Sequence, residues 1–216
     1  MNVIAVCAHP DDIEINCGGT LIRHVEKGDN VVMICVADGA TVNHRNEIIR
    51  SKDDAINEAK KAASIIGAKL YILGYKCLDI PFNHKIVADL ESIINEHRAD
   101  IVYTHWHDHT NQDHRRVSLS VLAAARCVKK VLMWEEGLPH STCISGFDPQ
   151  VYIDITSQNE KKIEAIRAHK SQVEKYGEEF MEAVVARARY RGYQIRKKYA
   201  ECFHVNRLVD DGFSDL

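Results

Sequence analysis

Short apolar segments alternate with helical patterns over the first 135 residues of the chain. The apolar runs are of the kind that form strands buried on both faces, and they lie at 3–8, 31–36, 69–73, 101–104 and 131–134. Between them, apolar residues recur at spacings of three, four and seven, which predicts helices over 49–66, 86–93 and 117–128. Gly67 follows the first of these stripes and suits a helix end. The alternation predicts an α/β, Rossmann-like three-layer fold with a mostly parallel central sheet.

The rest of the chain adds to this sheet without a clear boundary. A further extended segment, 151–155, follows a loop that contains Gly137, Pro139, Gly146 and Pro149. From Thr156 onward the pattern is charged and helical, so we expect a helical C-terminal segment. No internal repeat or low-complexity tract interrupts the chain. Its 216 residues are therefore predicted to form a single domain, 1–216.

Composition excludes several classes of function. The chain is 45% hydrophobic and 27% charged, which is typical of a globular protein with a buried core. A net charge of −3 argues against nucleic acid as a partner, and no apolar run approaches the roughly 20 residues of a transmembrane segment. The first residues lack the cationic region of a signal peptide. Seven cysteines without a Cys-x-x-Cys pair predict reduced thiols and a cytoplasmic location.

Two polar clusters each follow directly on a predicted strand, and they carry the candidate chemistry. The first is His-Pro-Asp-Asp at 9–12, and the second is the histidine-rich segment 105–114. Ligands bind outside the carboxyl ends of strands in open α/β sheets, so both clusters should face one crevice. Imidazoles and carboxylates suit zinc, which in catalytic sites takes three protein ligands and keeps one open position. His9, Asp12 and His114 are the expected ligands, and Asp11 is left to accept a proton.

These clusters resemble the motifs of a known enzyme family. AHPDDIEINCGGTL at 8–21 closely resembles the opening motif of the PIG-L/LmbE-like zinc-dependent N-deacetylases, and NQDHR at 111–115 resembles their second motif, usually His-x-Asp-His. The similarity continues downstream at 37–39, 151–156, 168–172 and 199–203.

The resemblance implies a hydrolase that removes the acetyl group from an N-acetylated amino sugar of the N-acetylglucosamine type, or from its conjugate. It implies one Zn²⁺ per chain on His9, Asp12 and His114, with Asp11 as general base. The partner is then a small-molecule amino-sugar substrate. Family members form assemblies, so a homo-oligomer is compatible with the sequence.

Asn111 departs from the family pattern, because many members carry the first histidine of His-x-Asp-His there. An asparagine amide can donate a hydrogen bond to an oxyanion but cannot deliver a proton. We place Asn111 and Asp113 among the catalytic residues, and the acid role passes to His107, His109 or protonated Asp11. Both Asn111 and Asp113 can also cap the helix that begins near His114.

Other polar residues have two readings each. His105, His107 and His109 alternate, so they can hold a second metal, but substrate-facing or hydrogen-bonded histidines are favoured. Asp108 binds sugar hydroxyls or orients one of these rings, and His169 is structural or lines the pocket. We take Asp108, His107, His109 and His169 as the predicted substrate-binding residues.

Two further features are interpreted as structural. Gly18-Gly19 is too short and wrongly spaced for a dinucleotide fingerprint, and it predicts close packing of the first helix near the metal-binding segment 9–12. The basic stretch 187–198 is read as a solvated helix face, with an anionic substrate carrier as the alternative.

Two rival functions stay open. One is a metallo-β-lactamase-type dinuclear hydrolase, suggested by His105-x-His107, although His109 and Thr110 break its register. The other is a catalytically altered carbohydrate-binding protein of the same fold.

Overall fold

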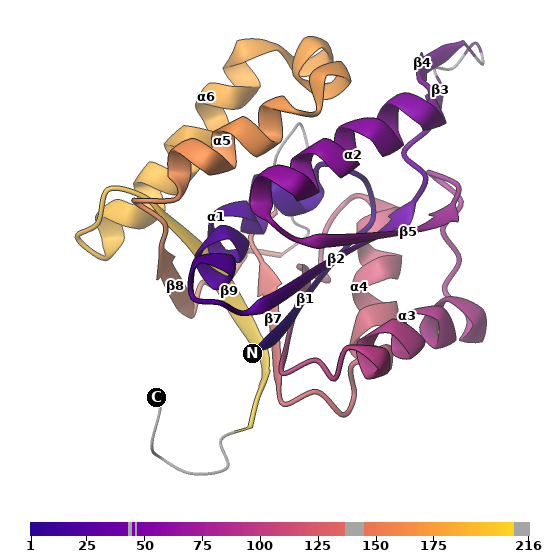
Figure 1. The fold of residues 1–216 in the computed structure, drawn as a ribbon, viewed down its shortest axis with the longest axis horizontal. Helices are drawn as coiled ribbons and strands as arrows, with labels where there is room; N and C mark the ends of the chain where they lie inside the picture. Colours follow the sequence, from indigo (N-terminus) through magenta and orange to yellow (C-terminus); the bar gives the residue numbers. More distant parts are fainter. Residues whose placement is uncertain (43–44, 46, 137–144, 210–216) are drawn as a thin grey trace.

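The computed structural model describes residues 1–42, 45, 47–136 and 145–209 (Figure 1). Its strands are β1 (Asn2–Cys7), β2 (Asn30–Ala37), β3 (Thr41–Val42), β4 (Ile48–Arg50), β5 (Lys69–Tyr75), β6 (Ile101–His105), β7 (Lys130–Trp134), β8 (Val151–Asp154) and β9 (Ala200–Leu208). Its helices are α1 (Asp12–Glu26), α2 (Lys52–Ile66), α3 (His84–Glu96), α4 (Gln112–Ala124), α5 (Asn159–Arg167) and α6 (Lys170–Gln194). Among these helices, none combines the length and the apolar character that a membrane crossing needs.

The main sheet has seven strands in the order β5-β2-β1-β6-β7-β9-β8. The strands from β5 to β7 pair in parallel, whereas β9 runs antiparallel to both of its neighbours. In the register, Val3 pairs with Val31 on one side and with Ile101 on the other, so β1 lies between β2 and β6. The predicted α/β fold with a mostly parallel sheet is confirmed. The residues directly after β1, β6 and β7 therefore lie side by side at one edge of the sheet.

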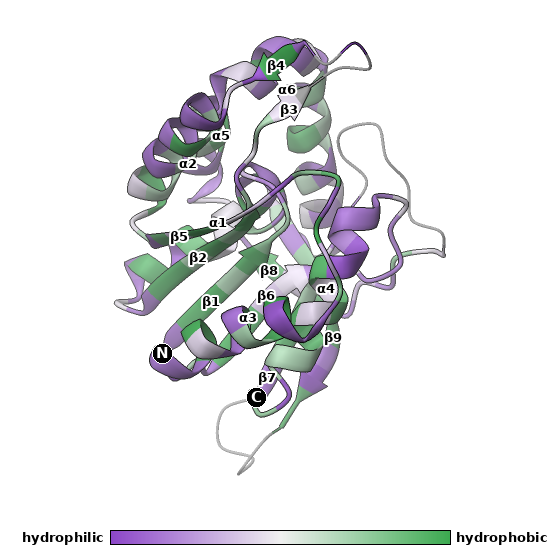
Figure 2. Cartoon of the chain, turned by 90° about the vertical axis from the view of Figure 1, so that its right-hand side faces the viewer, coloured by the Kyte–Doolittle hydropathy of each residue, from purple (hydrophilic) through white to green (hydrophobic). Residues whose placement is uncertain are grey.

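Helices cover both faces of this sheet (Figure 1). Alternate residues of β1 explain the layers: Ile4 packs in a core with α3 and α4, while Val3 packs in a core with α1, α2 and α5. A smaller cluster, which includes Phe180, joins α6 to α1 and α5. Figure 2 shows the central strands as largely hydrophobic, with hydrophilic residues on the outer sides of α2 and α5. Two buried cores therefore hold the sheet edge that carries the polar clusters.

The expectation of a helical segment from Thr156 onward is wrong for its last part. Helices α5 and α6 match it, but residues 200–208 form β9, which inserts between β7 and β8. The sequence pattern did not indicate this strand because it contains Glu201, a charged residue of a type usually found at the surface, which is buried here. Its carboxylate accepts hydrogen bonds from Thr20 N at 2.7 Å and from Lys162 Nζ at 2.6 Å.

Helix α2 begins at Lys52, three residues later than the predicted start at residue 49. Ser51 is the N-cap, and its hydroxyl accepts from Asp54 N at 3.0 Å. Ile49 therefore belongs to β4, where it is exposed. Gly67 ends the helix with a φ of 91°, as expected. Of the predicted loop residues, Gly137 and Pro139 lie outside the described part of the chain.

The prediction for the glycine pair in α1 is confirmed at Gly19. A Cβ atom built there would lie 2.8 Å from the side chain of Ile155, just beyond β8. Only glycine lets these two segments approach so closely. The expected place of this packing, near the segment 9–12, is wrong for Gly19, because its contact lies at the end of β8.

Candidate active site

The turn between β1 and α1 presents three polar side chains at the carboxyl edge of the sheet. The backbone N–H of His9 donates to Asp12 Oδ2 at 2.7 Å, so the aspartate closes its own turn. Asp11 has a φ of 123°, a conformation that L residues rarely adopt, yet its side chain makes no helix-cap hydrogen bond. Capping therefore does not account for the unusual backbone at Asp11.

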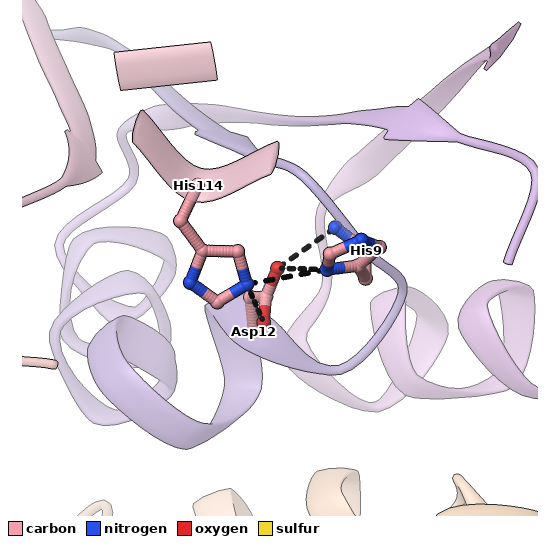
Figure 3. A group of neighbouring side chains, drawn as sticks. All are labelled: His9, Asp12 and His114. Atoms are coloured by element: carbon pink, nitrogen blue, oxygen red, sulfur yellow. Dashed lines mark hydrogen bonds and ion pairs between the residues drawn. The ribbon is translucent and has the colours of Figure 1, made fainter. Parts of the chain in front are cut away.

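His114, at the start of α4, completes a three-residue cluster with His9 and Asp12 (Figure 3). His9 Nδ1 lies 3.2 Å from His114 Nε2 and 3.6 Å from Asp12 Oδ2. His114 Nε2 lies 3.5 Å from Asp12 Oδ1. In a tetrahedral zinc site with bonds of about 2.0–2.1 Å, the ligand atoms stand about 3.3 Å apart. The two nitrogens and the carboxylate therefore fit the coordination shell of one divalent cation.

Charge within the cluster also suits a cation. Burial lowers the pKa of His9, but hydrogen bonds to Asp113 and Asp12 outweigh it and leave this pKa well above its usual value. Burial likewise lowers the pKa of His114, and the charges of Asp12 and Glu136 turn the net shift upward. The histidines in turn hold the pKa of Asp12 below its usual range, against the effect of burial. The site gathers negative charge around two imidazoles.

Two more carboxylates contact the outer nitrogens of these imidazoles. Asp113 Oδ2 lies 3.1 Å from His9 Nε2, and it also accepts from Leu78 N at 2.6 Å. Glu136 Oε2 lies 3.6 Å from His114 Nδ1. A carboxylate behind a ligating histidine fixes the ring and raises its basicity. Asp113 is thus placed behind His9, where it can orient that ring.

Glu136 was missed by the sequence analysis, although it follows β7 just as the other clusters follow β1 and β6. Its Oε1 pairs with His105 Nδ1 and accepts from Trp134 Nε1 at 2.9 Å. His105 Nε2 accepts the N–H of Ala8 at 2.8 Å. Both ring nitrogens of His105 have hydrogen-bond partners, which matches the hydrogen-bonded alternative rather than the substrate-facing one. The bond to Ala8 connects β6 to the end of β1.

Asn111 caps α4, as one of its two readings predicts. Its Oδ1 accepts from Asp113 N at 2.9 Å and from His114 N at 3.4 Å. Asp113 lies in the first turn, where its negative charge interacts favourably with the helix dipole. Because the oxygen of Asn111 serves the cap, its amide N–H groups are the part that can contact a ligand.

The three residues of the segment 105–114 that were predicted to bind substrate differ in exposure. His109 is buried and stacks on His114 with ring centroids 4.8 Å apart, and burial lowers its pKa to about 4. His107 is exposed and packs against Trp106, with ring centroids 4.3 Å apart. Asp108 Oδ2 accepts from Ser145 N at 2.9 Å. Of these three residues, His109 contacts His114. His107 and Asp108 instead contact Trp106 and Ser145.

His169 is fully buried, in a network of charged side chains behind Asp11. Its Nδ1 accepts from Arg50 Nη2 at 3.2 Å, and its Nε2 lies 3.1 Å from Glu14 Oε1. Arg50 Nη1 donates to Pro10 O at 3.2 Å. Because His169 is fully buried, the structure does not match the prediction that it lines the pocket and binds substrate. Arg50 was missed by the sequence analysis, because nothing in its local pattern points to the site.

The basic stretch is only partly a solvated face. Arg187 Nη2 donates to Ile15 O at 2.9 Å and to Asn16 Oδ1 at 2.8 Å. Arg191 pairs with Glu135 through two nitrogens, Nε donating to Oε2 at 2.9 Å. These two arginines therefore bind α6 to α1 and to the end of β7, which corrects the interpretation of the stretch as a solvated face.

The sequence matches a known family over more than half of its length. Residues 4–125 match the PIG-L family, described as GlcNAc-PI de-N-acetylase. The diacetylchitobiose deacetylase of Thermococcus kodakarensis is 26% identical over 215 residues, which cover 92% of this chain and 80% of the relative.

Solved structures share the fold. The N,N'-diacetylchitobiose deacetylase of Pyrococcus horikoshii, 22% identical, superposes with a TM-score of 0.80 over 94% of this chain and 83% of its own. GalB, the 4-carboxy-2-hydroxymuconate hydratase of Pseudomonas putida KT2440, is 21% identical and reaches 0.83 over 98% and 100%. The fold alone therefore does not fix the reaction.

Proposed function

The chain belongs to the PIG-L family of de-N-acetylases and is a deacetylase, and from that premise we propose that it uses zinc to hydrolyse the acetamide of an N-acetylglucosamine-type sugar or its conjugate. The family model, described as a de-N-acetylase, supports deacetylation rather than the hydration for which GalB is named. The diacetylchitobiose deacetylases among its relatives support an amino sugar as the substrate.

The observation that carries this proposal is the convergence of His9, Asp12 and His114. Their ligand atoms lie 3.2–3.6 Å apart, and a carboxylate lies behind each histidine. A bound zinc ion would polarise the acetyl carbonyl and bring the pKa of water near 7, from about 15.7 in bulk. Asp113 and Glu136 would keep the outer imidazole nitrogens of His9 and His114 turned away from the ion.

Asp11 is the residue that moves the proton. It adjoins the ligand Asp12, and its carboxylate is not used for capping. Burial and the charge of Asp12 raise the pKa of Asp11 to about 6, which suits a group that takes a proton from water and later returns it. Asp11 therefore acts first as general base and then, once protonated, as the acid that releases the amine.

Asn111 and His109 assist without carrying the proton. The amide N–H of Asn111 donates to the oxyanion that develops on the acetyl oxygen. His109, with its pKa near 4, is neutral at pH 7 and cannot deliver a proton as an imidazolium. His107 is the exposed histidine of the segment 105–114, and we assign it to contacts with the sugar or its carrier together with Asp108.

Acetate release tests the proposal directly. The chain is incubated with N-acetylglucosamine, diacetylchitobiose and N-acetylglucosaminyl conjugates, with and without a chelator, and zinc is counted by elemental analysis. We expect acetate from at least one substrate, loss with the chelator, recovery with zinc, and one zinc per chain. Acetate release that survives complete metal removal would overturn the zinc-dependent mechanism.

The two rival functions predict other outcomes. A metallo-β-lactamase-type centre needs His105 and His107 side by side, but His105 is buried and bonded to Ala8 and Glu136 while His107 is exposed. A second zinc per chain would support that rival. A carbohydrate-binding protein would bind these sugars and release no acetate.

A further inference from the structure

Both peptide planes around Asp11 are held by hydrogen bonds. On the N-terminal side, Pro10 O accepts from Arg50 Nη1 at 3.2 Å. On the C-terminal side, Asp11 O accepts from Ile15 N at 3.1 Å in the first turn of α1. The φ and ψ angles of Asp11, 123° and −28°, together set the orientation of one plane relative to the other. Fixing both planes therefore holds φ at 123°, where a non-glycine residue is strained.

The ring of Pro10 is immobilised as well. Gly39 has a φ of 78°, and a Cβ atom built there would lie 2.7 Å from Pro10 Cγ and 2.6 Å from Ala55 Cβ. The proline ring thus fits against a position that only glycine can occupy. The packing of its ring and the hydrogen bond to its carbonyl both restrict the residue before Asp11.

Arg50 is itself buried, and two side chains anchor it. Its side chain is 3% exposed, and Nη2 donates to Glu58 Oε2 at 2.7 Å and to His169 Nδ1 at 3.2 Å. Glu58 in turn accepts from Ser171 N at 2.8 Å and from Ser171 Oγ at 2.7 Å, which joins α2 to the start of α6. The guanidinium cannot shift without breaking several hydrogen bonds.

His169 carries the same network to the other side of Asp11. Its Nδ1 lies 3.2 Å from Arg50 Nη2, and on the other side of the ring its Nε2 lies 3.1 Å from Glu14 Oε1. Glu14 is three residues after Asp11 in the first turn of α1. Arg50 therefore contacts the residue before Asp11, and His169 contacts the turn after it. The two residues also contact each other.

We propose that Arg50 and His169, anchored by Glu58, are positioning residues that lock the strained backbone of Asp11 and so aim its carboxylate at the reacting water. This inference rests on the proposed function, because it assigns Asp11 the role of base. It gives His169 a role different from substrate binding. It also explains why α2 and the α5–α6 junction converge behind the β1–α1 turn.

Replacing Arg50 tests the proposal. Arg50→Met keeps the volume of the side chain but removes its hydrogen bonds, and a misplacement of about 1 Å in a catalytic group can lower the rate about 100-fold. We expect a fall in kcat of that order, with KM and zinc content close to wild type. Arg50→Ala should regain part of its kcat when millimolar guanidinium is added, because the free ion can occupy the vacated site. His169→Gln should lower kcat in the same way.

Lys162→Met is the matched control. Lys162 is a buried cation whose Nζ lies 2.6 Å from Glu201 Oε1, and this pair contacts α1 near Thr20 instead of near Asp11. Its replacement should lower stability and leave kcat unchanged. A general loss of kcat in both Arg50→Met and Lys162→Met would show that any buried cation matters equally, and would overturn the positioning role.

The crystal structure of Arg50→Met gives a readout that does not depend on activity. We expect Asp11 to leave positive φ in this variant. An unchanged φ would refute the proposal. A change in KM with kcat unaltered would also refute it, because Arg50 would then be a substrate-binding residue. If the wild-type chain releases no acetate at all, the proposed function fails, whereas the φ of Asp11 in the variant still decides whether Arg50 locks this backbone.

Discussion

Asp113 Oδ2 lies 3.1 Å from Nε2 of His9, on the opposite side of the ring from Nδ1, which faces His114. The aspartate is fully buried, and a second hydrogen bond, from Leu78 N at 2.6 Å, holds the same oxygen. Asp113 thus orients the ring of His9 from its outer side. The geometry separates two neighbours in sequence: His114 faces the centre of the cluster, while Asp113 holds the ring of His9.

Replacing Asp113 should therefore weaken metal binding without removing it. Loss of a carboxylate behind a ligating histidine lowers metal affinity about 10- to 100-fold, so Asp113→Ala should bind zinc that much more weakly. Competition with a chromophoric chelator measures the change. Asp108→Ala is the control, because Asp108 contacts Ser145 instead of a ligating histidine, and its affinity should match wild type. Equal affinities in all three proteins would contradict the supporting role of Asp113.

Asp11→Asn separates metal binding from proton transfer. The amide keeps the size of the side chain but cannot accept a proton, and general acid–base groups contribute about 10²–10⁴-fold to rate. We expect one zinc per chain, nearly unchanged KM, and a kcat reduced by a factor in that range. Steady-state kinetics with elemental analysis make the measurement. Near-native turnover in this variant would assign the base to another residue.

The candidate site was predictable from sequence wherever its residues follow a strand. His9, Asp12 and His114 come from the segments after β1 and β6, and neighbouring parallel strands end at a common edge. Glu136 follows β7 under the same rule and was predictable in the same way. The cluster therefore follows from local patterns combined with one rule of topology.

Residues that act through long-range contacts were not predictable in this way. Arg50 reaches Pro10 across 40 positions and His169 across 119, so no local pattern marks it. Strand β9 was missed because Glu201 is buried by pairing with Lys162, and a buried ion pair resembles two surface residues in sequence. Such contacts depend on how the helices pack, which hydrophobic periodicity does not specify.

The two adjacent glycines of α1 should respond oppositely to alanine. A Cβ atom on Gly18 would meet Lys162 Cγ at an ordinary 3.5 Å, so Gly18→Ala should stabilise the helix by about 0.5–1 kcal/mol. At Gly19 the Cβ would lie 2.8 Å from Ile155, and overpacking of this kind costs about 1–3 kcal/mol. Urea denaturation of both variants gives the two free energies. Destabilisation of similar size at both positions would show that the contact with Ile155 is not the cause.

Acid should remove the contribution of Glu135 to stability. Burial raises the pKa of this carboxyl, but Arg191 and Arg187 outweigh burial, so the pKa in the folded chain is lower than in the unfolded chain. A lowered folded pKa gives stability that is present above the unfolded pKa of about 4.3 and lost as pH falls through the folded value. Glu135→Gln, which removes a hydrogen-bonded charge, should then cost about 2 kcal/mol at pH 7 and progressively less below pH 4. The free energy of unfolding, measured in urea from pH 7 to pH 3, should show the two proteins converging toward acid. Parallel curves that keep a constant difference over this range would mean that packing, not the charge on Glu135, binds α6 to the end of β7.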